Sequence, residues 1–243
     1  MRSMDETIYA GAYWGPRKEL PEDCARRVDV LLRGLAAIDP SFGRWFQLGR
    51  SRQEAVRRPI EPTRQALERL IRRGRDRVFE DLGFRMRGWN GVEDDYDATG
   101  FDVTCGGYAD SMTNFCYFNL PSRGANAERV MTAEALCQLL RCMVLAWEPD
   151  SAVVTSAAHR DMVSSNPKPG TFVGWITYVS RRKGTVPPLP APVRIEPVED
   201  VGTLVVLTPE RFMASNPAHV AVAGRVHELL ARAGLLAPLR HSA

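Results

Sequence analysis

The chain lacks the features that mark secreted, metal-stapled and membrane-spanning proteins. It has no run of 18 apolar residues, and the charged start from Met1 to Glu6 is not followed by the apolar segment of a signal peptide. Its five cysteines form an odd set without a Cys-x-x-Cys pair, which indicates reduced thiols in a core rather than disulfides or structural zinc. These absences predict a cytoplasmic protein with no membrane contact, no metal and no cofactor.

The chain also has little lysine and little net charge. Lys18, Lys168 and Lys183 are the only lysines, and the formal net charge of +3 excludes a strongly basic nucleic-acid binder and an acidic mimic of nucleic acid. A hydrophobic content of 44% with 25% charged residues is typical of a globular protein and excludes disordered and fibrous classes. We expect one domain over residues 1–243, with sub-lobes 1–125 and 126–243 as the alternative division.

Strand and helix patterns alternate irregularly along the chain. Apolar spacing and helix-start signals predict four main helices, at 21–38, from Pro62 to Gly74, at 132–147 and at 216–234. Alternating or β-branched runs predict strands at 7–14, 101–105, 114–120, 152–155, 172–179, 193–198 and 204–207. The helix at 132–147 is apolar nearly all round, Leu145 included, so we expect it to be buried between layers. Because strict β-α-β alternation is absent, the fold class is α+β, with a mixed, largely antiparallel sheet flanked by helices.

One string resembles catalytic machinery. His159-Arg160-Asp161, with Asn166 five residues after the aspartate, has the spacing of a protein-kinase catalytic loop. The chain has no Gly-rich phosphate loop and no upstream strand lysine, so a surface pairing of Arg160 with Asp161 is favoured. An enzyme with unrecognised motifs that uses the His159/Asp161 region remains an alternative function, and it predicts a pocket that gathers these residues.

Two charged segments offer binding surfaces. Arginine is dense from Arg44 to Arg87, which makes a nucleic-acid-binding module a further alternative; interspersed carboxylates favour a solvated surface and no nucleic-acid partner. Glu93-Asp94-Asp95-Tyr96-Asp97 places four carboxylates around one tyrosine, between Gly91 and Gly100. This acidic loop lacks regular calcium-loop spacing; it is either a plain solvated loop or a surface for a basic partner, with the tyrosine as anchor.

A series of tryptophan, glycine and proline positions spreads over most of the chain. Its members are Tyr13-Trp14-Gly15-Pro16-Arg17, the helix at 21–38, Trp45, Gly83-Phe84, Trp89-Asn90-Gly91, Cys105-Gly106, Asn114 and Leu120-Pro121. In this order they resemble the immunity protein 52 family of bacterial polymorphic toxin systems.

The resemblance implies a small cytoplasmic antidote that binds an antibacterial toxin directly. The implied toxin is a nuclease of restriction-endonuclease type, delivered by a contact-dependent or type VI secretion route, and the family has no catalytic residues to carry over. Buried-anchor aromatics suit such an inhibitor, which makes the predicted partner-binding residues Trp14, Arg17, Trp89, Glu93, Asp94, Asp95, Tyr96 and Asp97. The alternative is that Trp14, Trp45 and Trp89 pack in the core or at its edge. The sequence does not fix an oligomeric state.

Overall fold

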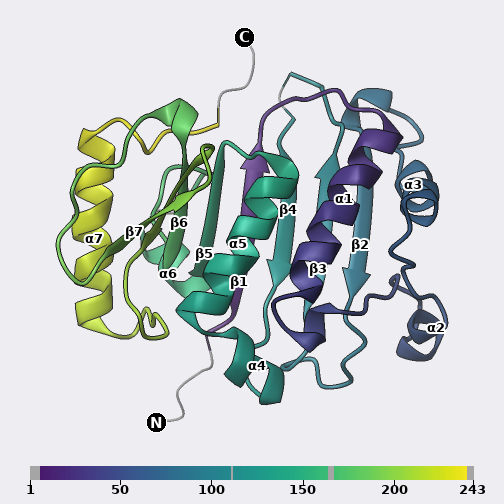
Figure 1. The fold of residues 1–243 in the computed structure, drawn as a ribbon, viewed down its shortest axis with the longest axis horizontal. Helices are drawn as coiled ribbons and strands as arrows, with labels where there is room; N and C mark the ends of the chain where they lie inside the picture. Colours follow the sequence, from purple (N-terminus) through teal and green to yellow (C-terminus); the bar gives the residue numbers. More distant parts are fainter. Residues whose placement is uncertain (1–5, 111, 164–166, 240–243) are drawn as a thin grey trace.

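An eight-stranded antiparallel sheet runs through the centre of the molecule (Figure 1). The computed structural model describes residues 6–110, 112–163 and 167–239. In chain order the strands are β1 (Ile8–Trp14), β2 (Phe84–Trp89), β3 (Gly100–Cys105), β4 (Asn114–Asn119), β5 (Ser151–Ser156), β6 (Ile176–Ser180), β7 (Arg194–Val198) and β8 (Gly202–Val206). Their order across the sheet is β2-β3-β4-β1-β5-β6-β8-β7, and each neighbouring pair is antiparallel. The expected α+β fold with a largely antiparallel sheet is thereby confirmed.

The helices are unevenly distributed over this sheet. They are α1 (Pro21–Ala36), α2 (Arg52–Val56), α3 (Arg64–Arg73), α4 (Ala125–Val130), α5 (Ala133–Trp147), α6 (Ala157–Val163) and α7 (Pro217–Arg232). Helices α1 and α5 pack on each other across one face of the sheet, α2 and α3 lie beyond β2, and α7 lies at the far side beyond β6 and β7 (Figure 1). Three long helices begin at residues that favour a helix start. Pro21 is the first residue of α1, and the side chains of Thr132 and Asn216 cap α5 and α7.

The main core lies between the sheet and helices α1 and α5. Strand β1 gives this core every second residue, namely Ile8, Ala10, Ala12 and Trp14. The opposite face of the same strand carries Tyr9, which joins Val153 and Phe172 in a second, smaller apolar cluster. Alternate residues of β1 therefore point to opposite faces of the sheet, and the two faces are buried in apolar clusters of different size.

The structure corrects three expectations. Strand β2 was not expected, because Phe84 and Met86 alternate with arginines inside a segment that reads as a solvated surface. Helix α5 is not buried between layers: it covers one face, with an exposed row that includes Leu145, whose apolar side chain hides the amphipathic pattern. Strand β6 begins at Ile176 rather than at 172. The short helices α2, α4 and α6 are not predicted either, because their sequences have no strong helical periodicity.

Candidate partner-binding surface

The acidic loop at 93–97 connects strands β2 and β3 at one edge of the sheet. Its base is closed by Asn90, whose backbone N–H donates to Thr99 O at 3.0 Å and whose side-chain Oδ1 accepts from Thr99 N at 3.1 Å. Glu93, Asp94, Asp95 and Tyr96 are exposed, whereas Asp97 is half-buried. The loop therefore presents a carboxylate-rich tip on a hydrogen-bonded base.

Asp97 serves the fold. Its Oδ1 accepts hydrogen bonds from the backbone N–H groups of Asn126 at 2.9 Å and Ala127 at 3.1 Å, which are among the first amides of α4. These amides have no partner inside the helix, so the carboxylate caps α4 from a distant part of the chain. Gly124 lies against this contact with φ +103°, and a Cβ there would stand 2.5 Å from Asp97 Cγ. Asp97 is thus a structural residue of the loop.

Asp94 and Tyr96 fix the shape of the loop tip. Asp94 Oδ1 accepts from Tyr96 N at 2.9 Å, and Tyr96 O accepts from Ser122 N at 2.8 Å. The guanidinium of Arg123 lies 3.6 Å from the centre of the Tyr96 ring, and the ring is still 53% exposed. The tip is therefore held in one conformation before any partner arrives, which lowers the ordering cost of binding.

Asp95 and Trp89 border a shallow groove of about 450 Å³ between α2 and strands β2 and β3. Asp95 forms an ion pair with Arg52 across its rim, and its side chain remains 81% exposed. Trp89 is half-buried and its ring packs at a tilt against Phe46, 6.2 Å between centroids. The structure thus brings Trp89 and the acidic loop together, and it adds Arg52, which the sequence reading did not connect with them.

Trp14 and Arg17 lie elsewhere, in the core and at its border. Trp14 is 2% exposed and stacks on Trp147 with centroids 5.1 Å apart. Arg17 lies over the Trp14 ring, donates to Trp147 O at 2.9 Å and pairs with Glu19 at 3.1 Å. Both side chains are engaged in holding β1 against the end of α5.

The kinase-like string is divided between core and surface. His159 is 2% exposed, packs edge-on against Phe212 and has its pKa lowered by burial. Asp161 is exposed and pairs with Arg160 at 2.8 Å, as the surface reading predicts. Asn166 lies outside the described residues. The imidazole is closed off from solvent, so the string does not gather its side chains in an open pocket.

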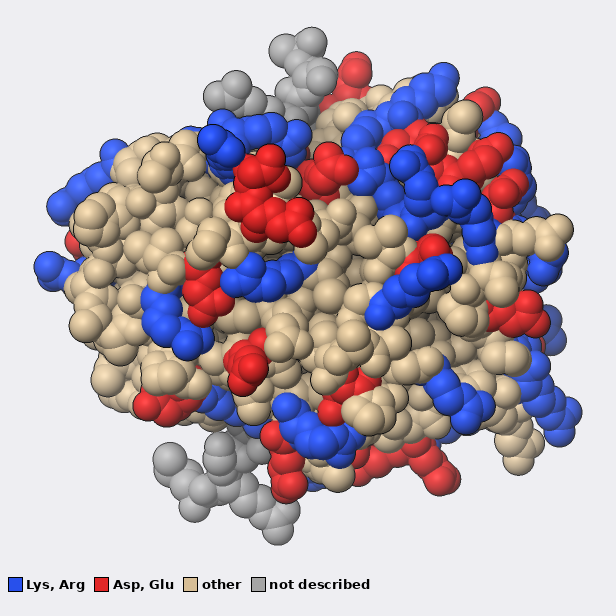
Figure 2. Space-filling view, viewed as in Figure 1, with Lys and Arg blue, Asp and Glu red and all other residues tan. Residues whose placement is uncertain are grey.

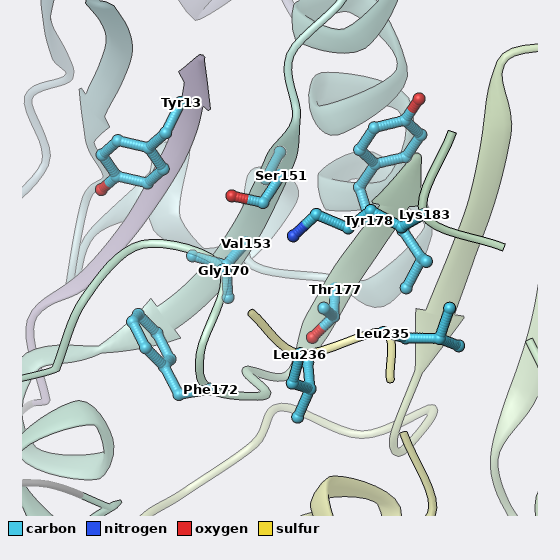
Figure 3. Close-up of a pocket in the computed structure, with 12 residues that line it drawn as sticks. Tyr13, Ser151, Val153, Gly170, Phe172, Thr177, Tyr178, Lys183, Leu235 and Leu236 are labelled. Carbon is cyan, nitrogen blue, oxygen red and sulfur yellow. The ribbon is translucent and has the colours of Figure 1, made fainter. Parts of the chain in front are cut away.

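A small cavity at the ends of β5 and β6 holds a hydroxyl and an amine. Figure 3 shows Ser151 and Lys183 directed into it beside Gly170 and Leu236. Ser151 Oγ has no hydrogen-bond partner among the described residues, and burial lowers the pKa of Lys183. The cavity volume is only about 10 Å³, which is room for about one water molecule. These groups are therefore not placed around a substrate-sized site.

Charged groups on the helix face are mixed. Figure 2 shows acidic and basic side chains interspersed over the face that carries α1 and α5. Part of the arginine-rich segment is neutralised by ion pairs: Arg58 with Glu54, Arg72 with Glu22 and Glu68, Arg75 with Glu80, and Arg85 with Asp102. Among the described residues, no three His, Cys, Asp or Glu side chains are grouped to hold a metal, and no helix is long and apolar enough to cross a membrane.

A solved structure has a similar fold. The T6SS protein PA0821 of Pseudomonas aeruginosa has a TM-score of 0.53 and 11% sequence identity, over 91% of this chain and 75% of that chain. At this identity the likeness shows a shared α+β fold. No protein with a curated description is detectably similar.

The family assignment is direct. The family model described as immunity protein 52 matches residues 6–239, nearly the whole chain. The chain belongs to the immunity protein 52 family, which confirms the resemblance carried by its tryptophan, glycine and proline positions. Membership supports an immunity role and suggests a non-enzymatic one.

Proposed function

We propose that this chain is a cytoplasmic antidote that binds and neutralises a cognate antibacterial toxin by forming a stoichiometric complex. The family match over residues 6–239 carries the proposal. The geometry agrees with it, because the acidic loop is an exposed, hydrogen-bonded surface rather than a cavity. A binding surface of this kind needs anchors and charge, not reactive groups.

A nuclease is the toxin class that the acidic loop fits best. Nucleases present a basic surface to phosphate, and a fixed group of carboxylates steers association with such a surface. Glu93 and Asp95 point their charge to solvent, and Tyr96 stands beside them as an amphipathic anchor. The loop would then occupy the electrostatic field that attracts nucleic acid.

Co-expression tests the function itself. The chain is produced with the toxin encoded next to its gene, and growth rescue and co-purification are scored. We expect growth to be restored and the two proteins to elute together in a fixed ratio. Toxicity that persists with a folded, abundant antidote, together with separate elution, would refute the proposal.

The loop is tested with a double variant, Glu93→Ser with Asp95→Ser, because neither side chain supports the fold in the way that Asp97 does. We expect the association rate with the toxin to fall about tenfold at low ionic strength, with less effect at high salt. Surface plasmon resonance measures both rates. The matched control is Glu210→Ser with Glu228→Ser, which makes the same charge change on exposed residues elsewhere. Equal association rates for the two double variants would show that the loop does not face the toxin.

A further inference from the structure

The turn between α3 and β2 exposes two adjacent large apolar side chains. Val78 is 78% exposed and Phe79 is 60% exposed, and Leu82 nearby is 37% exposed. A single exposed apolar residue is ordinary, but an adjacent pair held out from the surface is a typical feature of a contact site. We call residues 76–80 the apolar turn.

Hydrogen bonds and an ion pair shape the apolar turn. Asp76 Oδ1 accepts hydrogen bonds from Val78 N at 2.9 Å and Phe79 N at 2.8 Å, and these two bonds lower the pKa of Asp76. Arg75 and Glu80 form an ion pair at 2.7 Å across its ends. Just beyond it, Asp81 O accepts from Tyr108 N at 2.7 Å. These contacts hold the backbone on both sides of Val78 and Phe79, which lowers the conformational entropy lost when the two side chains bind a partner.

The surroundings of the apolar turn are concave and carry one arginine that is unpaired in the described part of the chain. A groove of about 650 Å³ lies beside it, bordered by Arg75, Arg77 and Arg85 and floored by Phe84 and Met112. Two of these arginines are paired, Arg75 with Glu80 and Arg85 with Asp102, and Asp76 also lines the groove. Arg77 has no ion-pair partner within the described residues. Arg77 therefore offers a positive charge to a carboxylate on a partner.

We propose that the apolar turn is a second anchor for the toxin, with Val78 and Phe79 inserted into an apolar pocket whose rim carries carboxylates that meet Arg77. This inference rests on the proposed function. A protein fits better than a lipid bilayer, because an adjacent pair of side chains beside a groove complements a shaped surface, whereas a membrane is matched by a broad amphipathic face.

The two anchors lie at opposite ends of one edge strand. The apolar turn precedes β2 and the acidic loop follows it, so the six residues of β2 separate the two anchors by about 17 Å. An interface of ordinary size, about 800 Å² on each partner, is roughly 30 Å across and spans both. Opposite charges at the two ends would fix the orientation of the toxin along β2.

The decisive experiment measures toxin affinity for Val78→Ser with Phe79→Ser in the full chain. We expect the dissociation constant to rise by about 30-fold or more, mainly through faster dissociation. The control is Ile195→Ser, an exposed apolar residue on β7 at the other edge of the sheet. Arg77→Glu is expected to slow association about tenfold, and Arg225→Glu, on the exposed face of α7, is its charge-matched control.

The outcomes separate this inference from the proposed function. Tight binding by the wild type with unchanged affinity in the Val78/Phe79 variant would overturn the second anchor and leave the antidote function standing. No binding by the wild type would remove both. Vesicles of phosphatidylserine and phosphatidylcholine serve as the competing probe. Loss of vesicle binding with unchanged toxin affinity would overturn the proposal in favour of a membrane contact.

Discussion

The carboxylates of the acidic loop divide into structural and solvent-facing groups at the scale of single residues. Asp97 is bonded to two amides of α4, and Asp94 to the amide of Tyr96. Glu93 is exposed and Asp95 meets only the exposed guanidinium of Arg52, a pairing worth about 0–1 kcal/mol. Replacing the loop's aspartates as a set would therefore change the fold together with the surface charge.

Asp97→Ala is predicted to reduce the free energy of unfolding by about 1 kcal/mol, because two amides of α4 lose their acceptor. Urea unfolding at pH 7 measures the change. Glu93→Ala is the control and should stay within about 0.5 kcal/mol of the wild type. If the two substitutions cost the same, the capping role of Asp97 is wrong.

At the scale of elements, the close contact between α1 and α5 depends on a glycine. Gly34 faces Cys142, and a Cβ at Gly34 would stand 2.7 Å from Cys142 Sγ and 3.4 Å from Cys142 Cβ. Glycine inside a helix costs about 1 kcal/mol of stability relative to alanine. At Gly34 this cost is partly offset by the close contact that it allows between α1 and Cys142 of α5. The close spacing of α1 and α5 over the core thus depends on two small residues, Gly34 and Cys142.

Gly34→Ala is predicted to stabilise the protein by less than the ~1 kcal/mol of its helix propensity, because the methyl group meets Cys142 Sγ, which must rotate away. In a Cys142→Ala background the same substitution should stabilise by up to about 1 kcal/mol. Thermal and urea unfolding of the four proteins in this cycle give both values. Equal effects of Gly34→Ala in the two backgrounds would contradict the predicted contact.

At the scale of the whole molecule, β1 joins the two halves of the chain. It is hydrogen-bonded to β4 on one side and β5 on the other, so residues 1–125 and 126–243 share one sheet. The first half, cut after residue 125, would leave β1 as an exposed edge without α5 over its core face. We therefore propose that residues 1–243 form one domain, in which sub-lobe 1–125 has no core independent of sub-lobe 126–243.

The full chain is accordingly predicted to unfold in one cooperative transition. Far-UV and near-UV circular dichroism in urea should give coincident curves, because the halves share the β1–β5 pairing. The isolated fragment 1–125 should show poorly dispersed amide resonances by NMR. Two separated transitions, or a well-dispersed spectrum of the fragment, would instead support two folding units.

Local elements with strong signals are predictable from the amino-acid sequence alone. Strand β1, helices α1, α3, α5 and α7, and the β3–β4 hairpin follow from apolar periodicity and from helix-start residues, which act over a few positions of the chain. The order of tryptophans and glycines also sufficed to indicate the family, since such positions mark close packing and special backbone conformations along the whole chain.

Which side chains are exposed to a partner depends on the tertiary packing. Two of the predicted partner-binding residues, Trp14 and Asp97, are engaged with Trp147 and with α4, contacts that join residues 133 and 29 positions apart. The exposure of Val78 and Phe79 depends likewise on how α3 meets β2, and a sequence pattern predicts a buried role for such residues. Local sequence patterns predict the helices and strands. Side-chain exposure depends on contacts between residues that are distant in the chain, so it follows from the arrangement of the sheet and helices.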